Sequence, residues 1–465
     1  MNRVTNISWR TASGSRLGGF AYRYDALGRI VSRAHDLGGA SFDRDYAYDG
    51  MDRLASDGGT AYAYDAAGNR TSRTESGETV DYTLGQGDRL ATWTGGSYRY
   101  DAAGCVTRIT RGADTWDLAW NGQYQLVSVS TNGAFAEAYA YDALGRRVTT
   151  TNAEGTERHV YDDSWQVVAD LDEDGNVIRS YVWGEGIDRL LAVKIGNRTY
   201  TALTDVQGTV WGYADEQGSV VARWTYDAWG NVLSEEIAEG AAELRAVRYR
   251  FQGRECSAAT GLVNFRMRWY DAVTGRWLSK DPIGLYGGLN LYSFCEGGCL
   301  NQRDISGLAI WSSHGNSRII IRSQDQECVL HNPSQDEFKN AIRSFRDRSI
   351  AELIIYSHGC IGVMEYGGTS GDQLSVTSNG VVFDDGERFS DYLIPKMGQD
   401  GRVVLSGCLT AYDGLLCNYF GENISSALSR DMPGVPVTGN KGLAIGSPFR
   451  STWNVGIRRT YRNGR

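Results

Sequence analysis

Hydrophobic and polar residues alternate in short runs along the first part of the chain, and many of these runs end at a Tyr-Asp pair. Residues 20–24 read Phe-Ala-Tyr-Arg-Tyr, and residues 46–48 and 62–64 both read Tyr-Ala-Tyr. Alternation with a period of two is the pattern of a β-strand that buries one face. We therefore expect strands, not helices, before residue 280.

The Tyr-Asp pair is an internal repeat. It occurs at Tyr24-Asp25, Tyr48-Asp49, Tyr64-Asp65, Tyr100-Asp101, Tyr141-Asp142, Tyr161-Asp162, Tyr226-Asp227 and Tyr270-Asp271. Several copies continue to a glycine three residues after the Asp, at Gly28, Gly68, Gly104, Gly145 and Gly230. Asp opens a turn by accepting a bond from the backbone that follows, and Gly supplies the positive φ of a tight turn. Stacked repeats predict a long spiralling antiparallel sheet over residues 1–280, in which Tyr and Asp are structural.

The pattern changes after residue 308. Apolar runs at Arg318–Arg322, Leu353–Tyr356 and Val403–Leu405 are typical of short buried strands, and a helix signal begins at Pro333. Strands that alternate with helices predict an α/β domain over residues 309–465 with a mainly parallel sheet.

Residues 281–308 form a junction between the two parts. Asp-Pro-Ile-Gly-Leu at Asp281–Leu285 is echoed by Asp-Ile-Ser-Gly-Leu at Asp304–Leu308. One interpretation is a pair of Asp-initiated turns that join two domains. The other is a self-cleaving site, because a pair of carboxylates with different pKa values can divide the acid and base roles.

The Tyr-Asp repeats and the run from Arg266 through Arg276-Trp277 to Asp281 resemble the RHS/YD-repeat proteins, the Tc-toxin C components among them. The resemblance implies a hollow β-shell and a variable toxin domain released by cleavage between Leu308 and Ala309, with Asp281 and Asp304 contributing. This sequence has Gly298-Cys299 where the family has Asn-Pro, and Asp304-Ile305 where it has Asp-Pro. The family's further acidic group between the two motifs corresponds to Glu296.

Two residues of the C-terminal part could carry covalent chemistry. His358 and Cys408 each follow directly on an apolar run, and the carboxyl ends of parallel strands meet at one sheet edge, where ligands bind. An imidazole beside a thiol gives a nucleophile and its base, and the backbone N–H groups of Gly359 and Cys408 could form an oxyanion hole. The order and separation resemble the caspase-like (clan CD) cysteine peptidases, although Ser406–Thr410 departs from the caspase motif. The alternative is that both residues are structural, and Cys360 is a rival nucleophile.

Charge and composition narrow the classes of function. The net charge of −9 lies entirely before residue 309, because the remainder has equal numbers of basic and acidic residues. A nucleic-acid-binding surface should be basic, so we expect no nucleic-acid partner. The eight Cys lack the paired spacing of a zinc site, so we expect neither metal nor cofactor and mostly reduced thiols. No signal peptide or membrane-spanning run is evident; we expect synthesis in a bacterial cytoplasm and export by a dedicated secretion system.

The resemblances to RHS/YD-repeat proteins and to caspase-like peptidases together imply a toxin-delivery protein whose C-terminal domain is a cysteine peptidase that acts in the target cell. The expected partners are a target-cell protein substrate, a cognate immunity protein and a secretion-system carrier. Two alternatives stay open. One is a toxin with another activity, such as a nuclease, NAD hydrolase or deaminase, and the other is a non-enzymatic YD-repeat surface protein.

Overall fold

The computed structural model divides the chain into two compact units, a shell unit (Val4–Ile310) and a C-terminal unit (Trp311–Arg465, with Met1–Arg3). The residues that it describes are 3–162, 165–184, 187–284, 289–308, 311–312, 318–323, 325–331, 335–356, 358–360, 363–365, 373–377, 380–383, 385, 387–406, 432, 437–440 and 458–461. None of the helices among these residues has the length and apolar composition of a membrane span.

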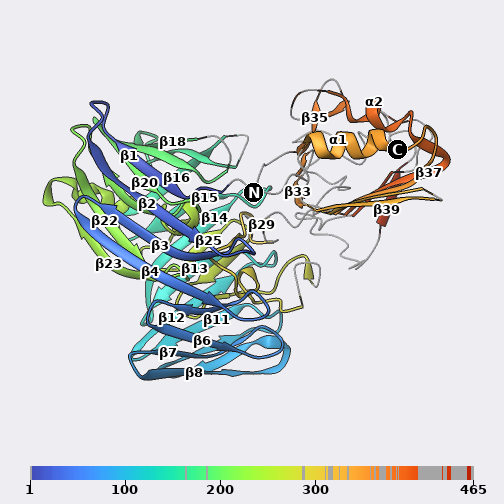
Figure 1. Ribbon diagram of the computed structural model, residues 1–465. Helices are drawn as coiled ribbons and strands as arrows, with labels where there is room; N and C mark the ends of the chain where they lie inside the picture. Colours follow the sequence, from blue (N-terminus) through green and yellow to red (C-terminus); the bar gives the residue numbers. More distant parts are fainter. Residues whose placement is uncertain are drawn as a thin grey trace. The chain divides into compact units, whose positions relative to one another are not determined.

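The shell unit is built on one 23-stranded sheet, in which each strand pairs antiparallel with the next strand in the sequence (Figure 1). We call this sheet the wall. Its strands are β1 Asn6–Arg10, β2 Arg16–Tyr24, β3 Ile30–Leu37, β4 Ala40–Tyr48, β5 Leu54–Asp57, β6 Thr60–Tyr64, β7 Arg70–Glu75, β8 Glu78–Leu84, β9 Leu90–Trp93, β10 Gly96–Tyr100, β11 Val106–Arg111, β12 Asp114–Trp120, β13 Leu126–Thr131, β14 Ala134–Tyr141, β15 Arg147–Asn152, β16 Gly155–Tyr161, β17 Val167–Leu171, β18 Val177–Trp183, β19 Leu190–Ile195, β20 Arg198–Thr204, β21 Val210–Ala214, β22 Val220–Tyr226 and β23 Val232–Ile237.

The Tyr-Asp repeat forms the predicted turns. In the first copy the side chain of Asp25 accepts a hydrogen bond from the backbone N–H of Arg29 at 2.8 Å, and Gly28 has φ of 80°. The same contact recurs between Asp142 and Arg146 at 2.9 Å. The prediction that Asp and Gly act as turn residues is therefore confirmed, because their side chain and backbone conformation close the turn.

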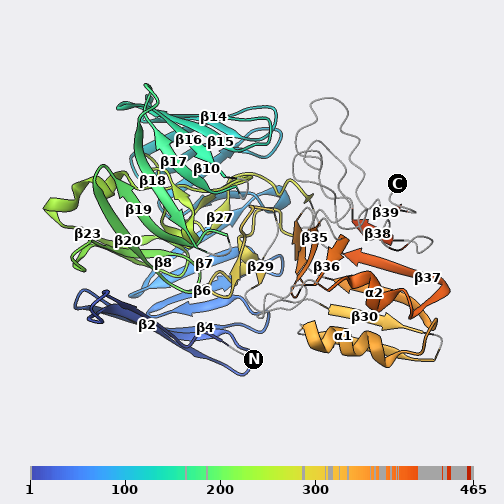
Figure 2. The same cartoon turned by 90° about the horizontal axis from the view of Figure 1, so that it is seen from above.

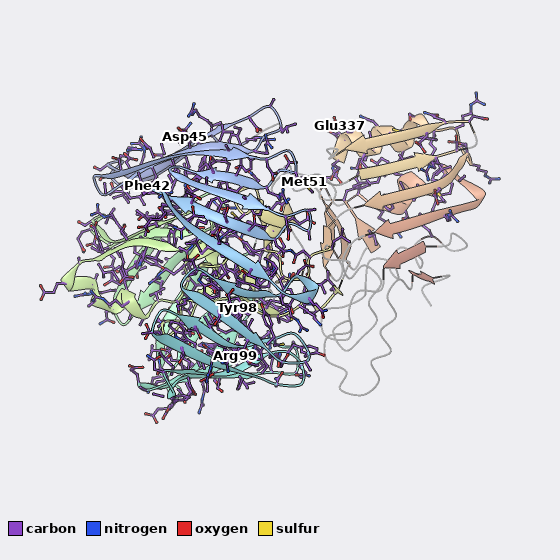
Figure 3. The ribbon with its side chains drawn as sticks, turned by 90° about the horizontal axis from the view of Figure 1, so that it is seen from below. Phe42, Asp45, Met51, Tyr98, Arg99 and Glu337 are labelled. Atoms are coloured by element: carbon purple, nitrogen blue, oxygen red, sulfur yellow. The ribbon has the colours of Figure 1, made fainter. Side chains whose placement is uncertain are left out.

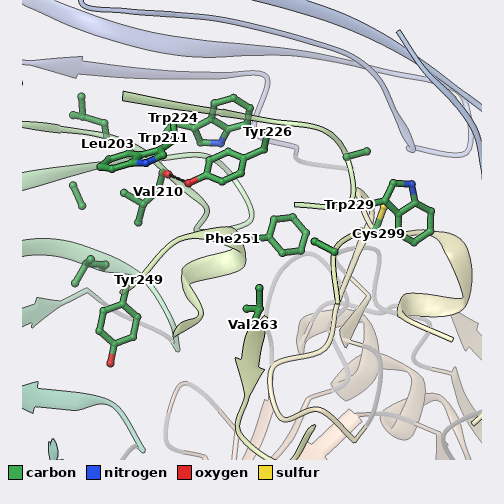
Figure 4. Close-up of a cluster of buried hydrophobic side chains, with 14 of the residues drawn as sticks. Leu203, Val210, Trp211, Trp224, Tyr226, Trp229, Tyr249, Phe251, Val263 and Cys299 are labelled. Carbon is green, nitrogen blue, oxygen red and sulfur yellow. Dashed lines mark hydrogen bonds between the residues drawn. The ribbon is translucent and has the colours of Figure 1, made fainter. Parts of the chain in front are cut away.

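The tyrosine before each Asp ties neighbouring strands together. The Tyr48 hydroxyl, at the end of β4, donates to the carbonyl of Ile30, the first residue of β3, at 2.6 Å. The Tyr226 hydroxyl donates in the same way to the carbonyl of Val210 at 2.9 Å (Figure 4). Each hydroxyl thus satisfies a carbonyl beside a turn, where the regular ladder ends.

One face of the wall is buried and the wall curls around it. Tyr98 of β10 is buried whereas its neighbour Arg99 is exposed (Figure 3), as strand alternation predicts. The rings of His35 in β3 and Trp211 in β21 lie 4.4 Å apart, so strands near the two ends of the wall meet across one core.

The wall ends at Ile237, earlier than the sequence predicted. The following residues, 239–308, which we call the inner segment, contain 3-10 helices at Glu239–Ala246, Phe251–Gly253 and Cys295–Gly297. They also contain the short strands β24 Glu255–Cys256, β25 Val263–Phe265, β26 Arg268–Asp271, β27 Arg276–Trp277 and β28 Gln302–Arg303. The expectation of one sheet up to residue 280 is wrong here, because β25 and β26 are buried at every position and leave no face for solvent.

The inner segment fills the space that the wall encloses. Its Tyr249, Phe265 and Trp277 are among the largest fully buried side chains, and Phe265 and Trp277 pack edge to face with ring centres 5.4 Å apart. Backbone hydrogen bonds join β27 and its neighbours to the wall, as from the N–H of Val106 to the carbonyl of Leu278 at 2.8 Å. Figure 2 shows β27 among the wall strands.

The C-terminal unit holds a six-stranded sheet in the order β31-β30-β32-β37-β38-β39. Its strands are β30 Arg318–Arg322, β31 Glu327–His331, β32 Ile350–Tyr356, β37 Met397–Ser406, β38 Val437–Asn440 and β39 Arg458–Tyr461, and its helices are α1 Gln335–Ser344 and α2 Phe389–Leu393. A second sheet contains β33 His358–Cys360, β34 Val363–Glu365, β35 Gln373–Thr377 and β36 Gly380–Val382, and the two-residue β29 is Trp311–Ser312.

The prediction of a mainly parallel sheet is wrong. Only β32, β37 and β38 pair in parallel among the described strands of this sheet, and its other pairings are antiparallel. The reason is local: β30 and β31 are linked by a turn that Ser323 closes through its bond to Gln326 at 2.8 Å, so they form a hairpin. The predicted helix is confirmed, because Phe338 and Ile342 of α1 are fully buried.

Candidate functional site

The junction brings its two aspartates to a single arginine. Nη1 of Arg268 lies 3.0 Å from Oδ2 of Asp281, and Nη2 of Arg268 lies 3.0 Å from Oδ2 of Asp304. All three side chains are buried. The planar guanidinium fork can bind two carboxylates at once, and its face lies 4.1 Å from the ring centre of Trp277.

Asp304 also holds the backbone that leads to the predicted cleavage point. Its Oδ1 accepts hydrogen bonds from the backbone N–H of Gly307 at 2.7 Å and of Leu308 at 3.0 Å. The Nε–H of Arg268 donates to the carbonyl of Gly307, and the side chain of Leu308 is buried. The peptide next to the Leu308–Ala309 bond is therefore fixed by the same groups that make the carboxylate pair.

Three consecutive carbonyls of this turn are bound by one stretch of the inner segment. Arg266 donates to the carbonyl of Ile305, the backbone N–H of Met267 donates to that of Ser306 at 3.1 Å, and Arg268 donates to that of Gly307. Gly307 has φ of 72°, and a Cβ there would lie 2.5 Å from the carbonyl oxygen of Phe265. The second Asp-x-x-Gly-Leu motif thus needs its glycine for close backbone approach.

Burial sets the protonation of the pair. It raises the pKa of Asp281 to about 7, and the charge of Asp304 adds to this, whereas Arg268 acts in the opposite direction. One guanidinium cannot neutralise two buried carboxylates, so a fraction of Asp281 is protonated near neutral pH. Two carboxyl groups of different acidity are the requirement for joint acid and base chemistry.

The structure thus brings together three of the predicted junction residues, Asp281, Asp304 and Leu308. Ala309 lies outside the described residues. Glu296 is exposed, so it is not part of the buried pair. No role for Arg268 followed from the sequence alone, although two carboxylates that lie together in a buried junction require a cation and Arg268 lies between Arg266 and Arg276.

The C-terminal candidates are only partly described. β32 and β37 pair in parallel, with Tyr356 opposite Ser406, and His358 and Cys408 lie two residues beyond these positions in the sequence. His358 and Gly359 belong to β33, which pairs with β34 in another sheet. Cys408 lies outside the described residues. The parallel neighbours are as expected, and the contact between imidazole and thiol stays a prediction.

One other cluster has the residue types of a metal site. Glu157, His159 and Asp170 place ligand atoms within 4.8 Å of one another. However, Asp170 pairs with Arg248 at 2.5 Å and with Arg179 at 3.0 Å, and Nδ1 of His159 is bonded to Asp170 at 2.8 Å. Two arginines neutralise the charge of the Asp170 carboxylate, so the cluster is a structural ion-pair network.

The thiols that the structure describes are unpaired. Cys105, Cys256, Cys295, Cys299 and Cys328 are all free, as expected for a reduced protein. Cys299, which replaces the proline of the related motif, is fully buried in the core.

Comparisons with known proteins identify relatives of the shell unit. Residues 10–290 match the Teneurin YD-shell family. The tRNA3(Ser)-specific nuclease WapA of Bacillus spizizenii is 32% identical over 167 residues, which are 35% of this chain and 7% of that protein. The double-stranded DNA deaminase toxin A of Burkholderia cenocepacia is 29% identical over 332 residues, covering 61% of this chain and 20% of that protein.

A solved structure shares the fold. The TcdB2-TccC3 structure superposes with a TM-score of 0.54 at 21% identity, and the match covers 66% of this chain and 18% of that one. The chain therefore matches a fifth or less of the length of each of these relatives.

Proposed function

Because the chain belongs to the Teneurin YD-shell family, we propose that it is the shell-and-effector part of a polymorphic toxin that cuts itself at the junction. The names of the relatives, a tRNA nuclease and a DNA deaminase toxin, support a toxin in which the shell is shared and the effector varies. The observation that carries self-cleavage is the bridging of Asp281 and Asp304 by Arg268 beside the buried Leu308.

The proposed reaction is hydrolysis of the Leu308–Ala309 peptide bond. The ionised Asp304 takes a proton from a water molecule as the oxygen of that water attacks the carbonyl carbon of Leu308. The protonated Asp281 gives its proton to the nitrogen of Ala309 as the C–N bond breaks, leaving a new carboxylate and a new amino group. Arg268 stabilises the carboxylate charge throughout, and the bonds that hold residues 305–307 keep the peptide in place.

The test is the mass and N-terminal sequence of the purified full chain. Cleavage should give a fragment that begins Ala-Ile-Trp, and Asp281→Asn should leave the chain intact. The matched control is Asp271→Asn, because Asp271 is also buried and paired with an arginine, Arg111 at 2.6 Å, but is not part of the pair at the junction. An intact wild-type chain would show that this junction does not cut.

For the effector we propose a cysteine peptidase that uses Cys408 as nucleophile and His358 as base, with Gly359 and Cys408 N–H groups as the oxyanion hole. The parallel pairing of β32 with β37 supports this, because both strands end at the same edge of the sheet. Its partners would be a target-cell protein, an immunity protein and a secretion-system carrier, and the protein would be made in the bacterial cytoplasm and exported.

The competing activities can be separated by expressing the full chain in bacterial cells. A peptidase predicts growth arrest that Cys408→Ala abolishes and that Cys328→Ala, at a described strand position, does not. Arrest that persists in Cys408→Ala, with degraded RNA or deaminated DNA, would instead indicate a nuclease or deaminase like the named relatives. No arrest in any variant, including the wild type, would favour a non-enzymatic surface protein.

A further inference from the structure

A narrow pocket in the shell unit lies where a turn of the wall meets the inner segment. Its lining includes Gly68 from the turn before β7, Arg70 at the start of β7, Trp229, Gly275, and Arg276 at the start of β27. It has room for roughly one water-sized group. No residue that lines it is acidic.

Several hydrogen-bond donors of this lining lack an acceptor. Nε and Nη2 of Arg70, Nε of Arg276 and Nε1 of Trp229 are buried without a hydrogen-bond partner. The exposed fractions of Arg70 and Arg276 are 6% and 4%. Buried N–H groups are nearly always bonded, so four unpaired donors on three residues that line one cavity indicate a missing acceptor.

The charges of the pocket are also uncompensated. The Arg70 guanidinium stacks 4.1 Å from the ring centre of Trp229 and 4.9 Å from that of Tyr62, and neither Arg70 nor Arg276 has a carboxylate within ion-pair distance among the described residues. Arg276 instead donates to the side-chain oxygen of Asn69 at 2.8 Å. Burial lowers the pKa of Arg276, and the charge of Arg70 acts in the same direction.

A second arginine-rich pocket in the same unit differs because its lining includes a carboxylate. It is lined by Arg147, Arg254 and Arg266 together with Glu255. Glu255 pairs with Arg147 and, at 2.8 Å, with Arg248. There the chain itself supplies the anion, whereas the pocket of Arg70 and Arg276 has the cations and no carboxylate.

We propose that the pocket between Arg70, Arg276 and Trp229 binds a small inorganic monoanion of the size of chloride. The room in the pocket excludes phosphate, sulfate and organic anions. The backbone is already close packed here, because a Cβ on Gly275 would lie 2.5 Å from Nη2 of Arg70. The bound anion would join the turn of the wall to the inner segment five residues before Asp281.

Two measurements on the full chain test this site. Crystals grown or soaked in bromide should show an anomalous peak within hydrogen-bond distance of the Arg70, Arg276 and Trp229 nitrogens. In solution, chloride replacing gluconate at constant ionic strength should stabilise the fold. At a chloride concentration ten times the dissociation constant, the folded-to-unfolded ratio should rise about 11-fold.

Trp229→Phe is the informative variant, since it removes one N–H and keeps an aromatic ring under Arg70. It should weaken the chloride dependence, and Arg276→Met should abolish it. The matched control is Arg250→Met, because Arg250 also stacks on a tryptophan, 4.0 Å from the ring centre of Trp224, but donates to the carbonyl of Tyr249 at 3.1 Å. An empty pocket in bromide, or equal chloride dependence in Trp229→Phe and wild type, would overturn the proposal, even if the junction cleaves normally.

Discussion

Arg268 and Asp304 form an ion pair, and both side chains also bind the turn at Gly307. Nη2 of Arg268 lies 3.0 Å from Oδ2 of Asp304, and Arg268 also donates to the carbonyl of Gly307, whose N–H bonds to Oδ1 of Asp304 at 2.7 Å. The ion pair and the conformation of this turn therefore depend on the same two side chains. A substitution of Arg268 should affect both the stability of the fold and cleavage.

Replacing Arg268 by Met should destabilise the fold and abolish cleavage. Without the guanidinium, two buried carboxylates lose their partner, which we expect to lower the free energy of unfolding by about 3–5 kcal/mol and to stop cleavage. Urea unfolding and intact mass measure the two effects. Arg23→Met is the control, because its pair with Asp45 is exposed and should contribute less than about 1 kcal/mol. Equal losses in the two variants would contradict the assignment.

The raised pKa of Asp281 predicts a definite pH dependence. Its value rises from 3.8 to about 7 in the folded protein, so between these pH values the folded state binds more protons than the unfolded state. This contribution to stability is fully present below pH 3.8 and is lost as pH rises through 7, on the order of 4 kcal/mol in total.

Two measurements test the raised pKa of Asp281. The free energy of unfolding of Asp281→Asn should gain on that of the wild type between pH 5 and pH 8. The cleavage rate of the wild type should fall about tenfold per pH unit above 7, because the acid form of Asp281 is needed. A rate that rises with pH in this range would assign Asp281 as the base instead.

Glycines in the turns between wall strands should differ in how they tolerate a side chain. Gly230 and Gly175 have φ of 92° and 86°, so Ala at either position should cost about 1 kcal/mol in strain. A Cβ on Gly230 would also lie 2.5 Å from the ring of Phe251, whereas nothing lies within 4 Å at Gly175. Gly230→Ala should therefore lose a further 1–3 kcal/mol or so, measurable by urea unfolding of both variants.

The proposed nucleophile should be the most reactive thiol of the C-terminal unit. A nearby imidazole raises the thiolate fraction of a cysteine, so iodoacetamide should label Cys408 ahead of Cys328, and His358→Ala should remove this preference. Burial raises the pKa of the Cys328 thiol, which makes it a slow reference. Equal labelling rates, measured by peptide mass, would exclude the dyad.

The sequence was sufficient to predict the wall because the residues that form each turn lie close together in the sequence. Asp25 and Gly28 close a turn within five residues, and the same spacing repeats at Asp142 and Gly145. The inner segment was mispredicted because its residues are buried by contacts distant in sequence, such as Val106 with Leu278. Arg268 was missed for the same reason: its role depends on Asp281 and Asp304, and only the fold shows that one side chain reaches both.

The order of the wall strands has a consequence for how the chain assembles. Because β1 to β23 pair in sequence order, each hairpin can form as soon as its own residues leave the ribosome, without waiting for distant partners. Arg268, Asp281 and Asp304 all follow the last wall strand, β23, in the sequence. The proposed cleavage after Leu308 would therefore depend on wall strands that precede it in the sequence, so the order of synthesis would set when the bond can be cut.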